Sequence, residues 1–132
     1  MRKTAIQYKS TAISLAKDLK KIDYNLLPIN DYNKRYIGNL KPTLDYFFKI
    51  NAACLQEGIK NTAVPVSELT IIDYGGGSGF LSMLAKKIGI KQVIYVDTNA
   101  NSVETIKVLK EKTGIGPDVI LHGDSDILID WC

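Results

Sequence analysis

An acidic residue and a run of glycines stand in the middle of the chain, in a pattern that could bind a ligand. Asp73 is followed by Gly75, Gly77 and Gly79, which gives the alternating pattern D-x-G-x-G-x-G. Glycine permits backbone conformations with φ > 0, and its missing Cβ lets a ligand lie against the main chain. The first N–H groups of a following helix lack partners within that helix and point to the same place. The segment therefore predicts a loop that binds a ligand through its backbone.

Two common nucleotide-binding loops do not fit this pattern. The dinucleotide fingerprint G-x-G-x-x-G, started at Gly75 or at Gly77, would need its third glycine at Phe80 or at Ser82. A P-loop would place a lysine after its last glycine, where this chain has Phe80. A pyrophosphate-containing cofactor such as NAD is therefore disfavoured.

Two further acids stand at the ends of apolar segments. Asp97 ends the segment Val93–Asp97, and it lies 18 positions after Gly79. Asp124 belongs to the sequence His122-Gly123-Asp124-Ser125, which follows a third apolar segment. Ligands of open α/β sheets bind at the carboxyl ends of the strands, so we expect the loop and both acids to meet at one edge of a sheet.

The three elements together resemble the cofactor half of the class I S-adenosylmethionine-dependent methyltransferases. The D-x-G-x-G-x-G pattern is similar to motif I of that family, and Asp97 and Asp124 stand where its second and third strands end. The resemblance covers about Leu69 to Leu128. It implies a methyltransferase with S-adenosyl-L-methionine as its cofactor, and it leaves the methyl acceptor unknown.

The resemblance also implies roles for the residues at the ends of the second and third strands. Asp97 would accept hydrogen bonds from both ribose hydroxyls, and Thr98 is expected near the adenine. Asp124 would accept from the adenine amino group, with the backbone of Ser125 nearby. The alternative for Asp124 is the cap of a turn or helix, and for Asp97 it is the start of a helix.

Further roles fall on the loop after the first strand. Gly75, Gly77 and Gly79 would allow close approach to the methionyl and adenosyl parts of the cofactor. Asp73 would help to hold the methionine ammonium group, or it would be a buried carboxylate that fixes the loop. The ring of Tyr74 would cover the cofactor or pack in the core.

The sequence assigns no catalytic acid or base, and no metal ligands. His122 follows an apolar strand, and we expect it to be structural rather than a base. Arg35 and Tyr36 are further candidates for contact with the methionyl carboxylate, from a helix in the N-terminal part of the chain.

The elements that must position these residues follow from apolar spacing and from turn residues. Helices are expected first, and a β-α-β-α-β series after them. The expected elements are helices at about 4–21 and from Pro42 to a cap at Gly58, strands at 69–73, 93–97 and 118–121, a helix ended by Gly89, and a helix begun by a capping box from Asn101 to Glu104.

The fold class predicted is α/β, with a partial, Rossmann-like parallel sheet of three strands behind an N-terminal helical segment. We expect that segment to span residues 1–66 and the cofactor-binding part to span 67–132. Since the family's sheet has seven strands, we expect a truncated domain, in which the first strand keeps an unpaired edge. Such an edge favours a homo-oligomer, formed through the strand or through the N-terminal helices.

Composition places the chain among ordinary globular proteins. Of its 132 residues 45% are hydrophobic, and no apolar run is long enough for a membrane span. The cysteines Cys54 and Cys132 indicate neither disulfides nor a zinc site; Cys54 is expected in the core, and a cytoplasmic location is the simplest. Residues 1–60 hold 11 Lys/Arg against 5 Asp/Glu, a net +6. This basic part of the chain could bind nucleic acid or an acidic partner, although the preferred interpretation of its charges is a solvated helical face.

Two other functions remain possible on these observations. One is a module that binds S-adenosylmethionine, or acts through its helices, without transferring a methyl group. The other is an NAD-dependent oxidoreductase, which the missing third glycine disfavours.

Overall fold

Three short strands form a parallel sheet in the order β1-β2-β3. They are β1 (Thr70–Tyr74), β2 (Gln92–Asp97) and β3 (Val119–His122) in the computed structural model, which describes residues 5–132. The helices α4 (Phe80–Ile88) and α5 (Ala100–Thr113) connect consecutive strands. Such β-α-β crossovers place both helices on one face of the sheet. The α/β fold with a three-stranded parallel sheet is therefore confirmed.

Successive residues of each strand point to opposite faces of the sheet. Asp73 pairs with Tyr95 across β1 and β2, so these two side chains share the face covered by α4 and α5. Ile72 pairs with Ile94, and these side chains share the other face. Because Tyr95 and Asp97 are two positions apart on β2, both lie on the helix-covered face.

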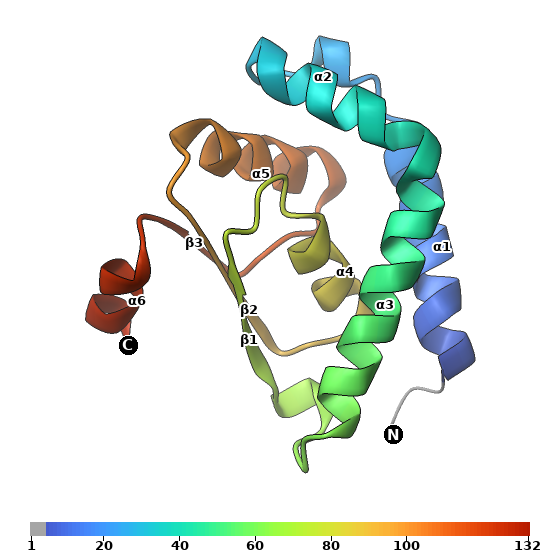
Figure 1. The fold of residues 1–132 in the computed structure, drawn as a ribbon, viewed down its shortest axis with the longest axis vertical. Helices are drawn as coiled ribbons and strands as arrows, with labels where there is room; N and C mark the ends of the chain where they lie inside the picture. Colours follow the sequence, from blue (N-terminus) through green and yellow to red (C-terminus); the bar gives the residue numbers. More distant parts are fainter. Residues whose placement is uncertain (1–4) are drawn as a thin grey trace.

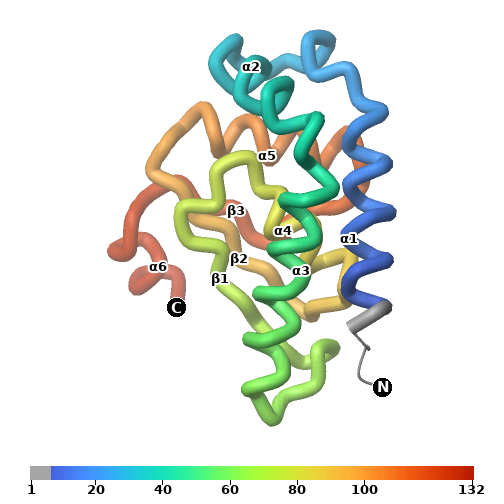
Figure 2. The backbone as a smooth tube through the Cα atoms, turned by 45° about the vertical axis from the view of Figure 1, so that its right-hand side comes forward, coloured from blue at the N-terminus to red at the C-terminus, as the bar shows by residue number. Residues whose placement is uncertain are grey.

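Two long helices form a second layer outside α4. They are α1 (Ala5–Lys20) and α3 (Leu44–Lys60), which run side by side in both views (Figures 1 and 2). Their apolar stripes join α4, α5 and β2 in one core. The helix α6 (Ser125–Trp131) lies on the opposite side of the sheet from these helices (Figure 1).

Shorter elements connect the long helices and lead into the sheet. The helix α2 (Asp31–Leu40) lies across the end of the molecule near α5 (Figure 1), and the 3-10 turns Tyr24–Leu26, Lys41–Thr43 and Val66–Glu68 lie in the connections. None of the helices within residues 5–132 is both long and apolar enough to cross a lipid bilayer.

Aromatic rings join the N-terminal helices to the start of α4. Phe80, the first residue of α4, is 2% exposed, and its ring lies 5.7 Å from that of Phe48 and 6.2 Å from that of Phe47, centre to centre. Both partners are on α3, so the glycine loop that precedes Phe80 ends on an apolar contact with the N-terminal segment. The division at residues 66 and 67 stays a prediction, since this core contains residues from both sides of it.

Three local predictions are wrong. The cap of α5 is Asn99, whose side chain accepts from the N–H groups of Asn101 and Ser102, rather than Asn101 itself. Gly58 lies inside α3, which runs on to Lys60. Cys54 is exposed and not in the core, because its part of α3 borders an open groove beside β1. Thr4, the predicted start of the first helix, lies outside the described residues.

Candidate functional site

The glycine loop between β1 and α4 curls back over the end of β2. The φ values of Gly75, Gly77 and Gly79 are 69°, 58° and 80°. Residues other than glycine rarely adopt such backbone conformations. The N–H groups of Gly75 and Gly76 both donate to the carbonyl oxygen of Val96, at 2.7 and 3.2 Å. A Cβ added to Gly75 or to Gly77 would meet nothing within 4 Å. The outer surface of the loop therefore faces open space, where a ligand can reach the backbone.

Asp97 lies against this loop. Its Oδ2 accepts from the N–H of Gly77 at 2.9 Å, and its Oδ1 accepts from the N–H of Asn99 at 2.8 Å. The side chain is only partly buried, and the residues that follow it, from Thr98 to Ala100, are exposed. The predicted meeting of the glycine loop with the acid of the second strand is thus present in the fold.

Asp73 lies beneath the loop, on its protein side. It is 6% exposed and accepts a hydrogen bond of 2.6 Å from the hydroxyl of Ser82 on α4. Burial raises the pKa of the Asp73 carboxyl, hydrogen bonds from Ser82 oppose the rise, and the Asp97 carboxylate adds to it. This arrangement agrees with the second of the two expected roles, a carboxylate that fixes the loop; contact with the cofactor ammonium stays a prediction.

The residues after β3 come to the same edge of the sheet. His122 pairs with Asp97 across β2 and β3, and its Nε2 lies 3.0 Å from the carbonyl oxygen of Thr98. Asp124 caps α6 by accepting from the N–H of Asp126, and Ser125 begins that helix. Asp124 and Ser125 are both exposed, so the cap does not close the site to a ligand.

Other candidates stand farther out. Tyr74 is 59% exposed and, by strand alternation, lies on the face of the sheet opposite to Asp73. Tyr36 and Arg35 are exposed on α2. That helix is fixed to α5 by the buried Asn33, which donates to the hydroxyl of Thr105 at 2.8 Å and to the carbonyl oxygen of Asn101 at 3.2 Å.

Sequence reasoning missed three residues of this region: Asn33, Ser82 and Tyr95. Tyr95 is fully buried, and its hydroxyl donates to the carbonyl oxygen of Gly77 at 2.5 Å. Its position two residues before Asp97 was the available signal, because it places both side chains on one face of β2. No comparable signal in the sequence marks Asn33.

Comparison with known proteins gives matches to one family. Residues 51–127 match the family described as ribosomal protein L11 methyltransferase (PrmA), and this stretch is more than half of the chain. Proteins named ribosomal protein L11 methyltransferase are similar to it. The protein of Burkholderia orbicola is 36% identical over 46% of this chain and 22% of its own length, and that of Thermotoga petrophila is 32% identical over 47% of this chain and 20% of its own length. The protein of Ralstonia nicotianae is 37% identical over 41% of this chain and 18% of its own length. No solved structure matches the chain significantly.

These matches, the parallel sheet and the glycine loop define a class I S-adenosylmethionine-dependent methyltransferase fold in partial form, as the sequence predicts. More narrowly, the chain belongs to the ribosomal protein L11 methyltransferase (PrmA) family. The matched stretch amounts to about a fifth of the length of these curated relatives.

Proposed function

We propose that the chain binds S-adenosylmethionine between the glycine loop and Asp97, as the cofactor-binding part of a methyltransferase. The observation that carries this proposal is the contact between Gly77 and Asp97, which joins a loop open to ligand with a carboxylate at the end of β2. Both parts belong to residues 51–127, the stretch that matches the family.

The hydrogen bonds of Asp97 leave room for a ribose. An ionised carboxylate offers about four acceptor positions, two on each oxygen. The N–H groups of Gly77 and Asn99 take one position on each oxygen. One position therefore remains on each, which suits the two neighbouring hydroxyls of a ribose. The bonds from the backbone also fix the orientation of the carboxylate before a ligand arrives.

The other predicted residues complete the proposed site. Gly75 and Gly77 would offer their backbone to the methionyl part, while Thr98, Asp124 and Ser125 would lie around the adenine. Asp73 and Tyr74 would border the site from beneath the loop and from the outer face of β1, and Gly79 would keep the turn into α4 close-packed, because a Cβ there would clash with Ile106.

The chemistry of methyl transfer comes from the cofactor, whose sulfonium makes the methyl group electrophilic. The work of this chain is to bind and orient that group. The proposal needs no general acid or base among the described side chains.

For the acceptor we propose a ribosomal protein, on the ground that the curated relatives are named ribosomal protein L11 methyltransferases. The basic first 60 residues, with a net charge of +6, suit an acidic surface on that partner or on nucleic acid near it. A cytoplasmic location and a homo-oligomer formed through the open edge of β1 belong to the same proposal.

Binding of S-adenosylhomocysteine, measured by titration calorimetry, tests the proposed cofactor site. We expect the wild-type chain to bind it and not to bind NAD. Asp97→Asn keeps the shape of the side chain, removes its charge and replaces one acceptor oxygen by an NH2 donor, which cannot accept from a backbone N–H. Loss of charge-assisted hydrogen bonds of about 1.5–3 kcal/mol should weaken binding by at least about tenfold.

The matched control is Glu104→Gln, which neutralises an exposed carboxylate on α5 that pairs with Lys107. It should bind like the wild type. The proposal fails if the wild-type chain binds NAD alone, or if Asp97→Asn and Glu104→Gln bind S-adenosylhomocysteine equally well. Binding with full dependence on Asp97 but without methyl transfer would not separate the enzyme from the binding-module alternative, because we expect a truncated domain to be inactive alone.

A further inference from the structure

Tyr95 lies directly beneath the glycine loop. Its side chain has no exposed surface, although it ends in a polar hydroxyl. That hydroxyl donates to the carbonyl oxygen of Gly77, and the edge of the ring lies where a Cβ on Gly76 would be, 2.6 Å from two ring carbons. A buried phenol that bonds to the backbone of this loop can fix the position of the loop.

The same strand holds Gly77 from both sides. Tyr95 holds the carbonyl group of Gly77, and Asp97 holds its N–H group. The two side chains are neighbours on the helix-covered face of β2, so one rigid element sets both peptide groups that flank Gly77. With φ at 58°, Gly77 has the left-handed conformation that a free glycine adopts only part of the time.

We propose that Tyr95 is a positioning residue for the nucleoside part of the cofactor, acting by holding Gly77 against Asp97. The inference rests on the proposed cofactor site and adds a residue to it. With its hydroxyl bonded, the loop is already in its bound shape, and little conformational freedom is lost when a ribose binds to Asp97. Without that bond, Gly77 moves and the N–H that orients Asp97 is no longer fixed.

The state of the phenol fits this role. Burial raises the pKa of the Tyr95 hydroxyl, and the carboxylates of Asp97 and Asp73 raise it further. The hydroxyl therefore keeps its proton at physiological pH and donates. A carbonyl oxygen can only accept, so the bond to Gly77 requires this protonated form.

The test is Tyr95→Phe, which removes one oxygen and leaves the ring in place. Its matched control is Tyr24→Phe: Tyr24 is also buried, and its hydroxyl donates at 2.7 Å to the carbonyl oxygen of Leu19, which belongs to α1 and not to the loop. Both variants lose one buried phenol–carbonyl bond, so we expect a similar fall in melting temperature. Affinity for adenosine and for S-adenosylhomocysteine is then measured by calorimetry, and amide hydrogen exchange at Gly77 is measured without ligand.

We expect Tyr95→Phe to weaken the binding of both probes about fivefold, the factor for one net hydrogen bond, and to speed exchange at Gly77 by a similar factor. Tyr24→Phe should leave affinity and exchange at wild-type values. In the Asp97→Asn background, Tyr95→Phe should weaken adenosine binding much less than it does alone, because both substitutions act on the same contact.

Two results overturn the inference while the proposed cofactor site stands: wild-type affinity in Tyr95→Phe, or equal losses in Tyr95→Phe and Tyr24→Phe. A wild-type chain that binds neither probe would refute the cofactor site itself. Exchange at Gly77 would then still decide whether Tyr95 holds the loop.

Discussion

Gly76 offers a sharp test of how the loop is packed. Unlike its neighbours Gly75 and Gly77, it does not have a positive φ, so alanine at this position meets no backbone penalty. The obstacle is steric, since a Cβ would lie 2.6 Å from two ring carbons of Tyr95 and 2.8 Å from Oδ2 of Asp73. Both neighbours are buried and hydrogen-bonded, so neither can move aside freely.

We therefore expect Gly76→Ala to lower the free energy of unfolding by about 1–3 kcal/mol, the range for an added methyl group in a filled site. Equilibrium denaturation in urea measures this change. Gly38→Ala is the control: Gly38 is exposed inside α2, a Cβ there meets nothing within 4 Å, and alanine should raise stability by about 0.5–1 kcal/mol.

A double-mutant cycle identifies the cause. Tyr95→Val removes the ring, and in that background Gly76→Ala should cost about 1–2 kcal/mol less, with part of the cost left because Asp73 remains. Tyr95→Phe keeps the ring and should give no relief. If Gly76→Ala is neutral in the wild-type chain, or if Tyr95→Phe and Tyr95→Val relieve it equally, the packing described for this loop is wrong.

Two other predictions concern the edge of the sheet and the buried acid. Ile72 is 49% exposed on the open edge strand. Ile72→Lys should shift the chain from oligomer toward monomer at micromolar concentrations, as measured by sedimentation velocity. A wild-type chain that is already monomeric contradicts the proposed self-association. For Asp73, whose pKa is raised in the folded state, the native protein binds the proton more tightly than the unfolded chain. Stability should therefore fall as pH rises from about 3.9 through the raised pKa, and Asp73→Asn should lose this slope in urea titrations at several pH values; an unchanged slope contradicts it.

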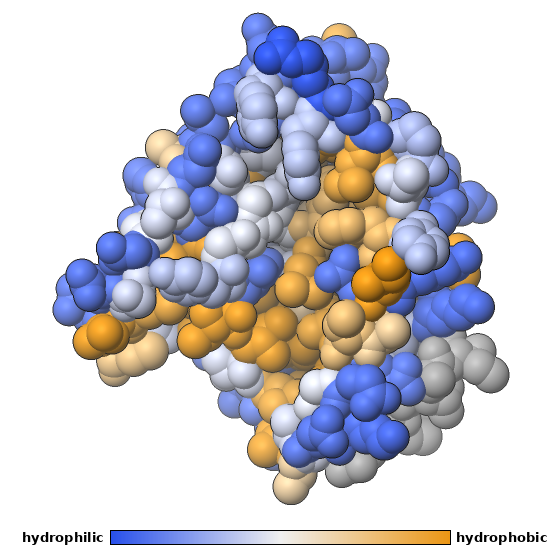
Figure 3. Space-filling view, viewed as in Figure 1, coloured by the Kyte–Doolittle hydropathy of each residue, from blue (hydrophilic) through white to orange (hydrophobic). Residues whose placement is uncertain are grey.

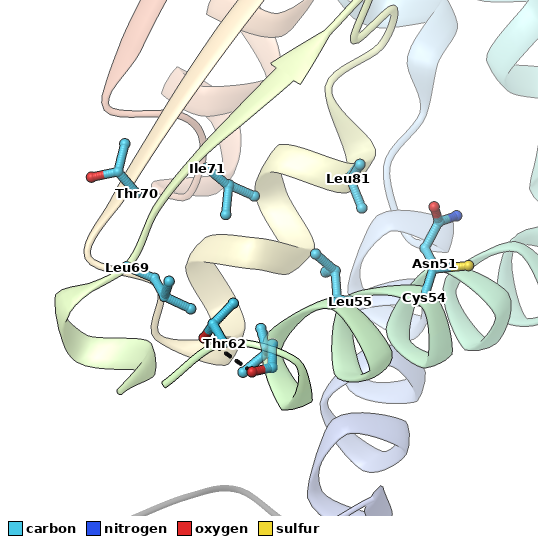
Figure 4. Close-up of a pocket in the computed structure, with 10 residues that line it drawn as sticks. Asn51, Cys54, Leu55, Thr62, Leu69, Thr70, Ile71 and Leu81 are labelled. Atoms are coloured by element: carbon cyan, nitrogen blue, oxygen red, sulfur yellow. Dashed lines mark hydrogen bonds between the residues drawn. The ribbon is translucent and has the colours of Figure 1, made fainter. Parts of the chain in front are cut away.

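The open edge of β1 borders an apolar groove. The groove has a volume of about 370 Å³ and lies between α3, β1 and α4, with Leu55, Ile71 and Leu81 pointing into it (Figure 4). Apolar side chains gather over the same region in the space-filling view (Figure 3). Among the described residues, β1 pairs only with β2, so its other side offers unpaired backbone groups beside this groove. Ile71 points into the groove on the helix-covered face, while Ile72 lies on the opposite face of the same edge strand.

Much of the fold could be predicted because its signals are local. Apolar periodicity gave α1, α4 and the three strands, and Gly89 ends α4 in the left-handed conformation expected of a helix-capping glycine. The capping box at Asn101 failed because Asn99, two residues earlier, offers its side chain to the same free N–H groups. Gly58 is not the residue that ends α3, since the helix continues for two residues beyond it.

The site was predictable to the extent that it follows strand ends. Asp97 and Gly77 meet because parallel strands end at one edge, and that rule needs no tertiary detail. The roles of Tyr95 and Ser82 could not be predicted, because in the sequence they look like ordinary strand and helix residues. Their hydrogen bonds form only when the loop folds over them. The role of Asn33 could not be predicted either, because its partners, Asn101 and Thr105, are about 70 positions away in the chain.

The packing of Phe80 has a practical meaning for anyone who wishes to isolate the cofactor-binding part. A peptide beginning at residue 67 would keep the glycine loop and both acids, but it would leave Phe80, Met83 and Leu84 without the rings and aliphatic chains of α1 and α3 that shield them from water. The smallest version of this part that keeps its shape therefore has to include the two N-terminal helices, even though most of their length lies outside the stretch shared with the family.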